Sequence, residues 1–169
     1  ASRVVDVGRT RPSSQGSLTA SYPYFDYLRS RTRSLEGLAG WGMTLVNLST
    51  GGQGISGLGN AVSGNYFTML GVKPALGRLF NSNDDDRVYK GHPVVVLSYA
   101  YWQSSFDGDR NVIGKKILVN NYPMTVIGVS AAGFAGLDPA LLGEHGASPD
   151  ADRRVLAGVQ VVFGLDVAR

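Results

Sequence analysis

AVSGNYFTMLGVKPALGRLF, residues 61–80, is the most informative segment of the chain, because it leads from an extended segment through a short helix into a turn rich in Gly and Pro. We predict the helix over 65–70. The hydroxyl of Ser63 can cap it by accepting a free backbone N–H of the first turn, and Gly71 should end it because glycine readily adopts a left-handed conformation. The stretch carries no group suited to chemistry, so we interpret it as architecture.

The side chains of the same stretch favour a structural role. Four apolar residues of the short helix should pack into the core rather than bind a ligand, namely Tyr66, Phe67, Met69 and Leu70. Residues 72–80 should cross the surface as a turn and a short extended piece. Glycines on both sides of the helix, Gly64 and Gly71, should be needed for the backbone geometry. The residues assigned to this structural motif are Ser63, Gly64, Asn65, Tyr66, Phe67, Gly71, Pro74, Gly77 and Arg78.

The composition is that of a globular chain. Hydrophobic residues make up 43% of the 169 residues, which is enough for one domain or two small lobes. The absence of cysteine excludes disulfides and thiolate metal sites but leaves the compartment open. No segment approaches the ~18–20 successive apolar residues of a membrane-spanning helix, and the N-terminus lacks the pattern of a signal peptide. We therefore expect the chain as given to be soluble; if it acts at a membrane, either its anchors lie outside the given chain or it docks on a protein that has them.

The basic residues do not form a pattern typical of a nucleic-acid site. The formal net charge is +3, and much of it lies in the first 36 residues. Arg29, Arg31 and Arg33 alternate with Ser and Thr, so on a helix they spread around the circumference and leave no stripe for phosphates. We expect a solvated helix face and no nucleic-acid partner.

Several elements are predicted before the central stretch. A strand over 3–10 precedes a helix over 22–34, for which Ser21 is a suitable N-cap and Pro23 is tolerated in the first turn. One helix face should bury three apolar side chains with an arginine at its edge, and it carries Tyr24, Tyr27, Leu28 and Arg31. A hairpin should follow, formed by extended segments over 37–50 and 55–63. Its Gly-rich turn lacks the lysine and the following helix of a phosphate-binding loop.

The segment 81–86, NSNDDD, is the only cluster of carboxylates in the chain. Three adjacent acids can bind a calcium ion, but their spacing differs from that of the twelve-residue calcium loop. We therefore interpret the segment as a solvated loop, with metal binding as the alternative.

The second half begins with a strong strand pattern. Residues 93–97 include three successive valines and should form a central strand that is buried on both faces. Ser98 should cap a helix over 99–106. Three aromatic residues of this helix should pack inward, namely Tyr99, Trp102 and Phe106. Segments 112–119 and 122–130 should form a hairpin through Asn120 and Asn121, because asparagine tolerates positive φ.

Four blocks, in order, carry a resemblance to a known family. They are SYPYFDYLRSRTRSLEGLAGW, VSGNYFTMLGVKPALGRLF, PVVVLSYAYWQSSFDGD and VIGKKILVNNYPMTVIGVSAAGF. Together they span 4–137 and resemble the MacB-like periplasmic core domain of FtsX-type ABC-transporter permeases. The resemblance implies an α+β fold with hairpins and short helices, built in two subdomains and inserted between the first two transmembrane helices of a permease. It assigns residues 1–137 to this domain.

The resemblance also implies a location and partners. The domain would lie on the periplasmic or extracytoplasmic side of the bacterial inner membrane, as part of a membrane protein. Its partners would be its own transmembrane helices, a cytosolic ATPase, a second permease subunit in a dimer and a periplasmic adaptor. ATP hydrolysis would move the outer domain, which would pass this motion to export substrates or partner proteins. No cofactor and no metal are implied.

Two other function classes remain as alternatives. A hydrolase would have to use His92 or His145, the only histidines, but no G-x-S-x-G motif supplies a nucleophile; we predict that the chain is not an enzyme. A small-molecule or peptide binding module is the alternative function, because two lobes can form a cleft. Four aromatic residues could line such a cleft, namely Tyr22, Tyr24, Trp41 and Trp102.

The tail, 138–169, departs from the family pattern. Its content of Ala, Gly, Asp and Arg matches no block of the resemblance. We treat it as a divergent or truncated tail, so the second subdomain is expected to be incomplete. Within it, 155–167 could pack as strand or helix, and its mixed period favours neither.

Overall fold

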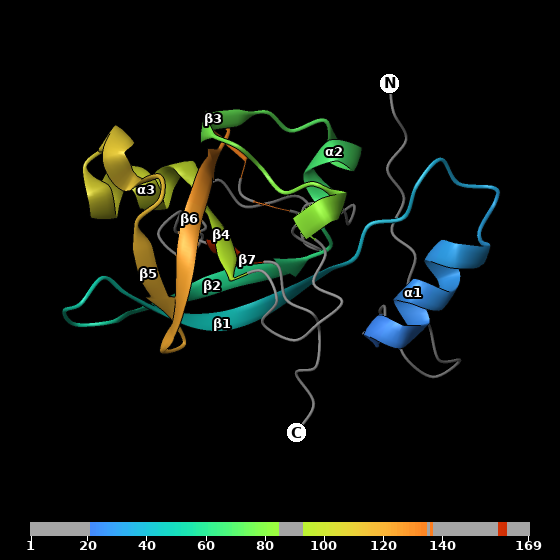
Figure 1. Cartoon of the computed structure of the whole chain (residues 1–169), viewed down its shortest axis with the longest axis horizontal. Coiled ribbons are helices and arrows are strands. Elements are labelled where there is room, and N and C mark those ends of the chain that lie inside the picture. The colour runs from blue at the N-terminus through green and yellow to red at the C-terminus, as the bar shows by residue number, and fades with distance from the viewer. Residues whose placement is uncertain (1–20, 85–92, 135, 137–158, 162–169) are drawn as a thin grey trace, which may run out of the picture.

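The computed structural model describes residues 21–84, 93–134, 136 and 159–161. These residues form a mixed α+β fold, as predicted (Figure 1). In chain order the helices and strands are α1 Tyr22–Arg31, β1 Trp41–Ser49, β2 Ile55–Val62, α2 Tyr66–Leu70, β3 Pro74–Gly77, β4 Val94–Leu97, α3 Tyr99–Phe106, β5 Lys116–Val119, β6 Tyr122–Ser130 and β7 Val159–Val161. Two 3-10 turns, Ser82–Asp84 and Arg110–Val112, complete the described elements.

All described strands join one sheet, which closes on itself. The strand order is β3-β6-β4-β7-β2-β1-β5, and β5 also pairs with β6. The strands β6, β4, β7, β2, β1 and β5 therefore form a ring, and β3 pairs with the C-terminal half of β6 beyond β5. A ring of so few strands is filled by side chains rather than by a channel. The prediction of a second subdomain remains a prediction.

Strand β4 lies inside the sheet, between β6 and β7, and its residues point into two different cores. Val95 and Leu97 belong to one hydrophobic cluster and Val96 to the other, and all three are fully buried. The alternation of side chains along a strand produces this division. It confirms the prediction of a central strand that is buried on both faces.

Each core draws on distant parts of the chain. The first cluster lies on the α3 side of the sheet and consists of Val46, Leu48, Val95, Leu97, Tyr101, Trp102, Val112, Ile117, Val119, Met124, Val126 and Val129. The second joins the sheet to α2 and consists of Val62, Tyr66, Phe67, Phe80 and Val96.

Both predicted hairpins are present. Strands β1 and β2 pair antiparallel from Trp41 opposite Val62 to Leu48 opposite Ile55. Strands β5 and β6 are joined by two residues of positive φ, 51° at Asn120 and 65° at Asn121, which is the geometry that two-residue hairpins favour. The first strand of the second hairpin begins later than the predicted residue 112. The reason is the 3-10 turn before it, where the Asp109 carboxylate accepts the N–H of Asn111.

Helix α3 has the predicted bounds and cap. The hydroxyl of Ser98 accepts the N–H of Tyr101 at 3.2 Å. Trp102 is buried as predicted, and its indole N–H donates to the carbonyl of Asp109 at 2.9 Å. Tyr99 and Phe106 are half-buried against the same core. Tyr101, which the helical pattern did not select, is more deeply buried than either.

Helix α1 differs from the prediction in three ways. It ends at Arg31 rather than residue 34, because Thr32 takes an extended conformation, and the Ser21 side chain makes no capping hydrogen bond. Tyr24 and Tyr27 are 38% and 51% exposed, so the prediction that they are buried was wrong. The physical reason is that α1 lies to one side of the sheet (Figure 1) and turns Phe25 toward it, with the ring 3.4 Å from where a Cβ on Gly40 would lie.

Other predictions fall outside the described residues. These are the strand over 3–10, the histidines 92 and 145, the acids 85 and 86, and most of the tail. The exception in the tail is β7, which lies within 155–167 and is a strand between β2 and β4. The boundary at 137/138 stays a prediction.

Candidate functional site

The predicted motif folds into a compact elbow around α2, which we call the α2 elbow and define as residues 63–84. Ser63 stands at its entrance. The Ser63 hydroxyl accepts the N–H of Gly40 at 2.9 Å and donates to the side-chain oxygen of Asn65 at 2.7 Å. The N-cap position belongs to Asn65, whose side chain makes no capping bond, so the prediction that Ser63 caps the helix was wrong. Ser63 instead ties α2 to the chain before β1.

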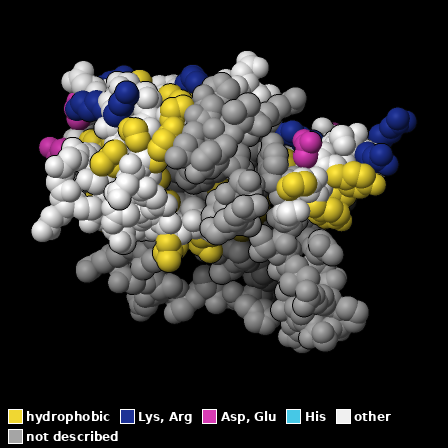
Figure 2. All heavy atoms as spheres, turned by 60° about the horizontal axis from the view of Figure 1, so that its bottom comes forward, with side chains coloured by type: hydrophobic (Ala, Val, Ile, Leu, Met, Phe, Trp, Pro, Cys, Tyr) yellow, Lys and Arg dark blue, Asp and Glu magenta, His cyan; other side chains and the backbone are white. Residues whose placement is uncertain are grey.

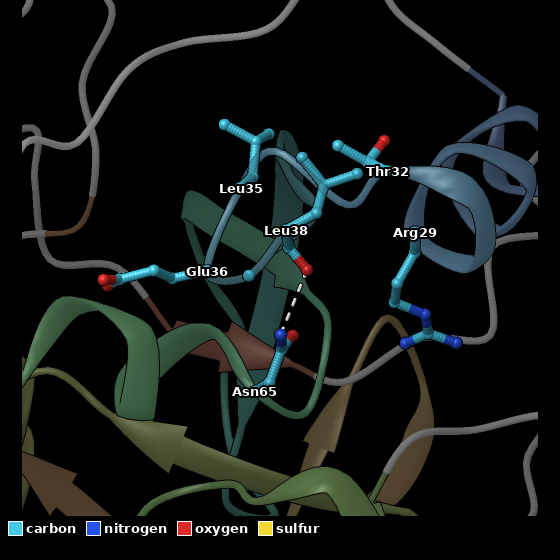
Figure 3. A pocket seen from close by; sticks show the side chains of 7 residues that line it. Arg29, Thr32, Leu35, Glu36, Leu38 and Asn65 are labelled. Atoms are coloured by element: carbon cyan, nitrogen blue, oxygen red, sulfur yellow. Dashed lines mark hydrogen bonds between the residues drawn. The ribbon is translucent and has the colours of Figure 1, made fainter.

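Asn65 strengthens the same connection. Its amide nitrogen donates to the carbonyl oxygen of Leu38 at 3.0 Å (Figure 3). A shallow hollow of about 180 Å³ lies here, lined by Arg29, Thr32, Leu35, Glu36, Gly37, Leu38 and Asn65. Ligand pockets for drug-sized molecules are typically about 300–1,000 Å³. The hollow is small, and its Arg29 and Asn65 side chains already bond to Asp26 and Leu38.

Two aromatic residues of α2 anchor the elbow in the second core. Tyr66 and Phe67 are fully buried, with ring centroids 5.3 Å apart in an edge-to-face arrangement. The Phe67 ring also packs against Phe80 at 5.6 Å and Phe134 at 5.8 Å. Edge-to-face and tilted pairs add to the stabilisation from burial. The predicted core role is confirmed for these two residues but wrong for Met69, which is 37% exposed because it lies on the outer side of the short helix.

The exit of α2 has the predicted glycine cap. Gly71 has φ 66°, and its N–H donates to the carbonyl of Thr68 at 3.2 Å, while the N–H of Val72 donates to Phe67 at 3.1 Å. Pairs of bonds of this kind satisfy the free carbonyls at the end of a helix. The requirement for Gly64 stays a prediction.

The elbow then meets β6 in very close backbone contact. Gly77 has φ 65°, and the N–H of Arg78 donates to the carbonyl of Ile127 at 3.0 Å. A Cβ on Gly128 would overlap the carbonyl oxygen of Arg78, and one on Gly77 would overlap that of Ile127. Only glycine fits at both points without moving the backbone.

Arg78 closes the elbow with a salt bridge. Its guanidinium donates two hydrogen bonds to the carboxylate of Asp84, at 2.7 and 2.9 Å, and the same carboxylate accepts the N–H of Asn81 at 3.0 Å. Asp84 is buried while Arg78 is half-exposed. The hydrogen bonds to Asp84 raise the pKa of Arg78 above its ordinary value. The interpretation of 81–86 as a solvated loop was therefore wrong at Asp84, because a cation six residues earlier folds back onto it.

Three of the four aromatic residues proposed to line a ligand cleft lie in different parts of the fold, and the side chain of the fourth, Tyr22, is outside the described part of the structure. Trp102 is buried in the first core, whereas Trp41 packs against the second. Tyr24 is exposed on α1. Tyr24, Trp41 and Trp102 do not line the hollow beside Asn65. Tyr24, Trp41 and Trp102 thus do not form together the aromatic-lined cleft that the alternative function would use.

The described residues hold no group of three His, Asp or Glu side chains placed to share a metal ion. No described helix is both long enough and apolar enough to span a bilayer. Polar side chains of the α2 elbow bond within the fold, so the arrangement can hold a shape.

Exposed apolar side chains occur in separate groups. In Figure 2 one group lies on α1 at the right, beside basic side chains, and others lie over the sheet at the left. Tyr27 is 51% exposed on α1, and Leu45 and Met43 are 76% and 54% exposed on β1. Their neighbours in the strand, Val46 and Leu48, are buried, as expected when one face of a strand packs and the other does not.

Two contacts that position this region have no clear signal in the sequence. The partner of Arg78 was hidden in a run of three acids, and only the short spacing between Arg78 and Asp84 could have suggested it. The hydrogen bonds between Asn47 and Asn120 join residues from two hairpins, and no local signal predicts them.

Comparison with known proteins identifies the relatives of the chain. A family model described as the MacB-like periplasmic core domain matches residues 2–158. The macrolide export ATP-binding/permease protein MacB of Burkholderia cenocepacia is 39% identical over 77 residues, which are 46% of this chain and 10% of that protein. MacB of Salmonella typhimurium is 38% identical over 72 residues, 42% of this chain and 10% of that protein. The chain thus matches about a tenth of the length of these relatives.

Solved structures share the fold. The periplasmic region of MacB from Actinobacillus actinomycetemcomitans aligns with a TM-score of 0.62 and 19% identity, over 86% of this chain and 56% of that one. The extracellular domain of the noncanonic ABC-type transporter YknZ from Gram-positive bacteria aligns with a TM-score of 0.61 and 16% identity, over 85% of this chain and 63% of that one.

Proposed function

The chain belongs to the MacB-like periplasmic core domain family, and we therefore propose that it transmits ATP-driven conformational change to export substrates or partner proteins. This family consists of periplasmic domains of transporter permeases and is not a family of catalytic enzymes. The proposed role is mechanical and non-catalytic. The energy would come from a cytosolic ATPase, and the motion would reach the domain through the transmembrane helices of its own permease.

The observation that supports this proposal is the set of contacts by which the α2 elbow packs against the sheet and bonds to it. Ser63 bonds to Gly40 before β1, Arg78 bonds to Ile127 on β6, and Tyr66 and Phe67 fill the core between them. A displacement applied to the chain before β1 would therefore move α2 and β6 with it, because packed interiors deform little. A unit in which these segments move together can transfer motion from one end of the domain to the other.

The proposed setting follows from the family. The domain would lie on the periplasmic or extracytoplasmic side of the inner membrane, in a permease dimer, with a periplasmic adaptor as a further partner. Small-molecule binding, the alternative function, gains no support from the small polar hollow beside Asn65.

The experiment uses the full-length parent permease in membrane vesicles, with Tyr66→Ala in this domain. Truncation of a buried aromatic residue costs about 3–5 kcal/mol and should loosen the elbow. We expect export to fall at least tenfold while ATP hydrolysis continues, because ATP hydrolysis by the cytosolic ATPase is then no longer coupled to movement of this domain. The matched control is Ala100→Ser, a change at an exposed residue of α3. Unchanged export from a permease whose domain has lost protease resistance would contradict the proposal.

The non-catalytic part has its own test. A screen of the purified chain against esters, phosphates and glycosides should show no turnover. A single activity that disappears when His92 is replaced would overturn this part of the proposal.

A further inference from the structure

Strand β7 occupies a slot between two deeply buried strand edges. On one side it runs parallel to β2, with Gly59 opposite Val159 and Ala61 opposite Val161. On the other side it runs antiparallel to β4, with Val95 opposite Val161 and Leu97 opposite Val159. Strands β2 and β4 do not pair with each other, so β7 alone joins these two edges.

The slot cannot remain empty without cost. The β2 residues Gly59, Asn60 and Ala61 are buried, and the β4 residues Val95, Val96 and Leu97 are fully buried. Each of these backbone segments carries N–H and C=O groups that need partners when water is excluded. The physical requirement is for an extended backbone between β2 and β4, and it does not demand a particular chain.

The present occupant is short. Strand β7 forms three register pairs with β2 and three with β4, whereas β1 forms eight with β2. In the sequence, residues 137–158 separate it from Gly136, the preceding described residue. A strand held by few pairs at the end of a long connection can be replaced by a competing strand, because only those pairs must be exchanged.

We propose that the slot between β2 and β4 is a strand-acceptor site, in which an extended segment of a partner polypeptide replaces β7. The partner segment would alternate apolar and polar residues as Val159–Val161 does, since that pattern is the one the slot already holds. The main-chain ladder supplies affinity in such strand addition. This inference rests on the proposed function. The strand-acceptor site would be the place where the domain binds a partner protein, within the sheet rather than on its surface.

The test uses the whole chain and a fluorescent peptide of residues 155–165, VLAGVQVVFGL, with binding measured by anisotropy. The control peptide carries Gln160→Pro, which removes the N–H at the centre of the ladder. We expect the unmodified peptide to bind and the proline peptide to bind at least tenfold more weakly. Equal binding of the two peptides, or no binding of either, would overturn the proposal.

A second experiment uses a variant of the whole chain in which its own strand β7 can no longer compete with the added peptide. The whole chain with Gln160→Pro should bind the unmodified peptide about tenfold or more tightly than the wild-type chain does, because a tethered strand competes at a high effective concentration. If this variant fails to fold alone, addition of the peptide should restore a cooperative thermal transition, and failure to restore it counts against the site. These measurements need neither ATP nor a membrane, so a failed strand-acceptor site and a failed export role would be told apart.

Discussion

Asn47 and Asn120 hold the ends of two hairpins together through a pair of hydrogen bonds. The N–H of Asn47 donates to the side-chain oxygen of Asn120 at 2.7 Å, and the N–H of Asn120 donates to the carbonyl of Asn47 at 2.8 Å. Next to them, β1 and β5 pair only through Leu48 with Val119 and Ser49 with Leu118. The asparagine pair thus lies at the shortest antiparallel seam of the closed sheet.

Two substitutions of Asn120 should separate the contribution of its side-chain hydrogen bond to stability from that of its positive φ. Asn120→Gly keeps the positive φ but removes the side-chain acceptor, and should destabilise the fold by about 1 kcal/mol. Asn120→Ala also introduces left-handed strain and should cost about 1–2 kcal/mol more. Urea unfolding would measure both values. The matched control is Asn121→Gly, at the neighbouring residue with φ 65°, which should be nearly neutral; equal effects of Asn120→Gly and Asn121→Gly would contradict this account.

The Arg78–Asp84 salt bridge should depend on the two-pronged geometry of the guanidinium as well as on its charge. Arg78→Ala leaves the buried Asp84 carboxylate without its two guanidinium bonds and should destabilise the fold by about 1–3 kcal/mol. Arg78→Lys should recover only part of this, because an ammonium group cannot make the two-pronged contact. Thermal unfolding would rank the three proteins. A lysine variant as unstable as the alanine variant would show that charge contributes nothing here.

At Gly71 the cost should come from the backbone alone. Its φ is 66°, and a Cβ built there meets no atom within 4 Å, so steric overlap is absent. Gly71→Val should destabilise the fold by about 1 kcal/mol or more, because branched residues avoid this conformation. Gly71→Asn should cost less, because asparagine tolerates positive φ. An unchanged midpoint of thermal unfolding in the valine variant would count against the helix cap.

Ser130 is a position where removal of a polar group should do no harm. It ends β6 opposite Pro74, is completely buried, and its hydroxyl has no hydrogen-bond partner among the described residues. Because a buried hydroxyl without a partner carries a desolvation cost, Ser130→Ala should leave stability unchanged or raise it by up to about 1 kcal/mol. Ser98→Ala is the contrasting variant, since the Ser98 hydroxyl caps α3, and it should destabilise by about 1 kcal/mol. Urea unfolding of both would test the difference.

Asp109 should make stability depend on acid pH. Its pKa is held below its ordinary value first by the hydrogen bond from Lys115, at 2.9 Å, and then by the N–H of Asn111. A carboxyl with a lower pKa in the folded chain stabilises it above the unfolded pKa of about 3.9, and this contribution is lost as pH falls through the folded pKa. Asp109→Asn should therefore weaken the loss of stability on acidification, measured by urea unfolding at neutral and acid pH. Lys115→Gln should act in the same direction, and acid profiles identical to the wild type would refute the assignment.

Elements whose signals are local could be predicted from the amino-acid sequence. Ser98 capped α3, Gly71 ended α2, and Asn120 with Asn121 formed a two-residue turn, because caps and positive-φ turns depend on a few adjacent residues. Strand β4 was correctly predicted to be buried on both faces, since a continuous apolar run has no polar face: Val95 and Val96 are fully buried, although Val94 at its start is only partly buried. The four ordered blocks also identified the family that the comparison found.

Which surfaces pack against each other could not be predicted from the sequence and follows from the folded arrangement. The apolar face of α1 resembled a core face, yet Tyr27 stayed exposed because the helix packs through Phe25 instead. Asp84 was predicted to be one of three solvated acids, but in the folded chain Arg78 forms a salt bridge with it. The residues of β7 have no clear hydrophobic period, because the position of this strand depends on pairing with β2 and β4. Periodicity states which side of an element can be buried, whereas the partner that buries it is set by contacts between residues far apart in the chain.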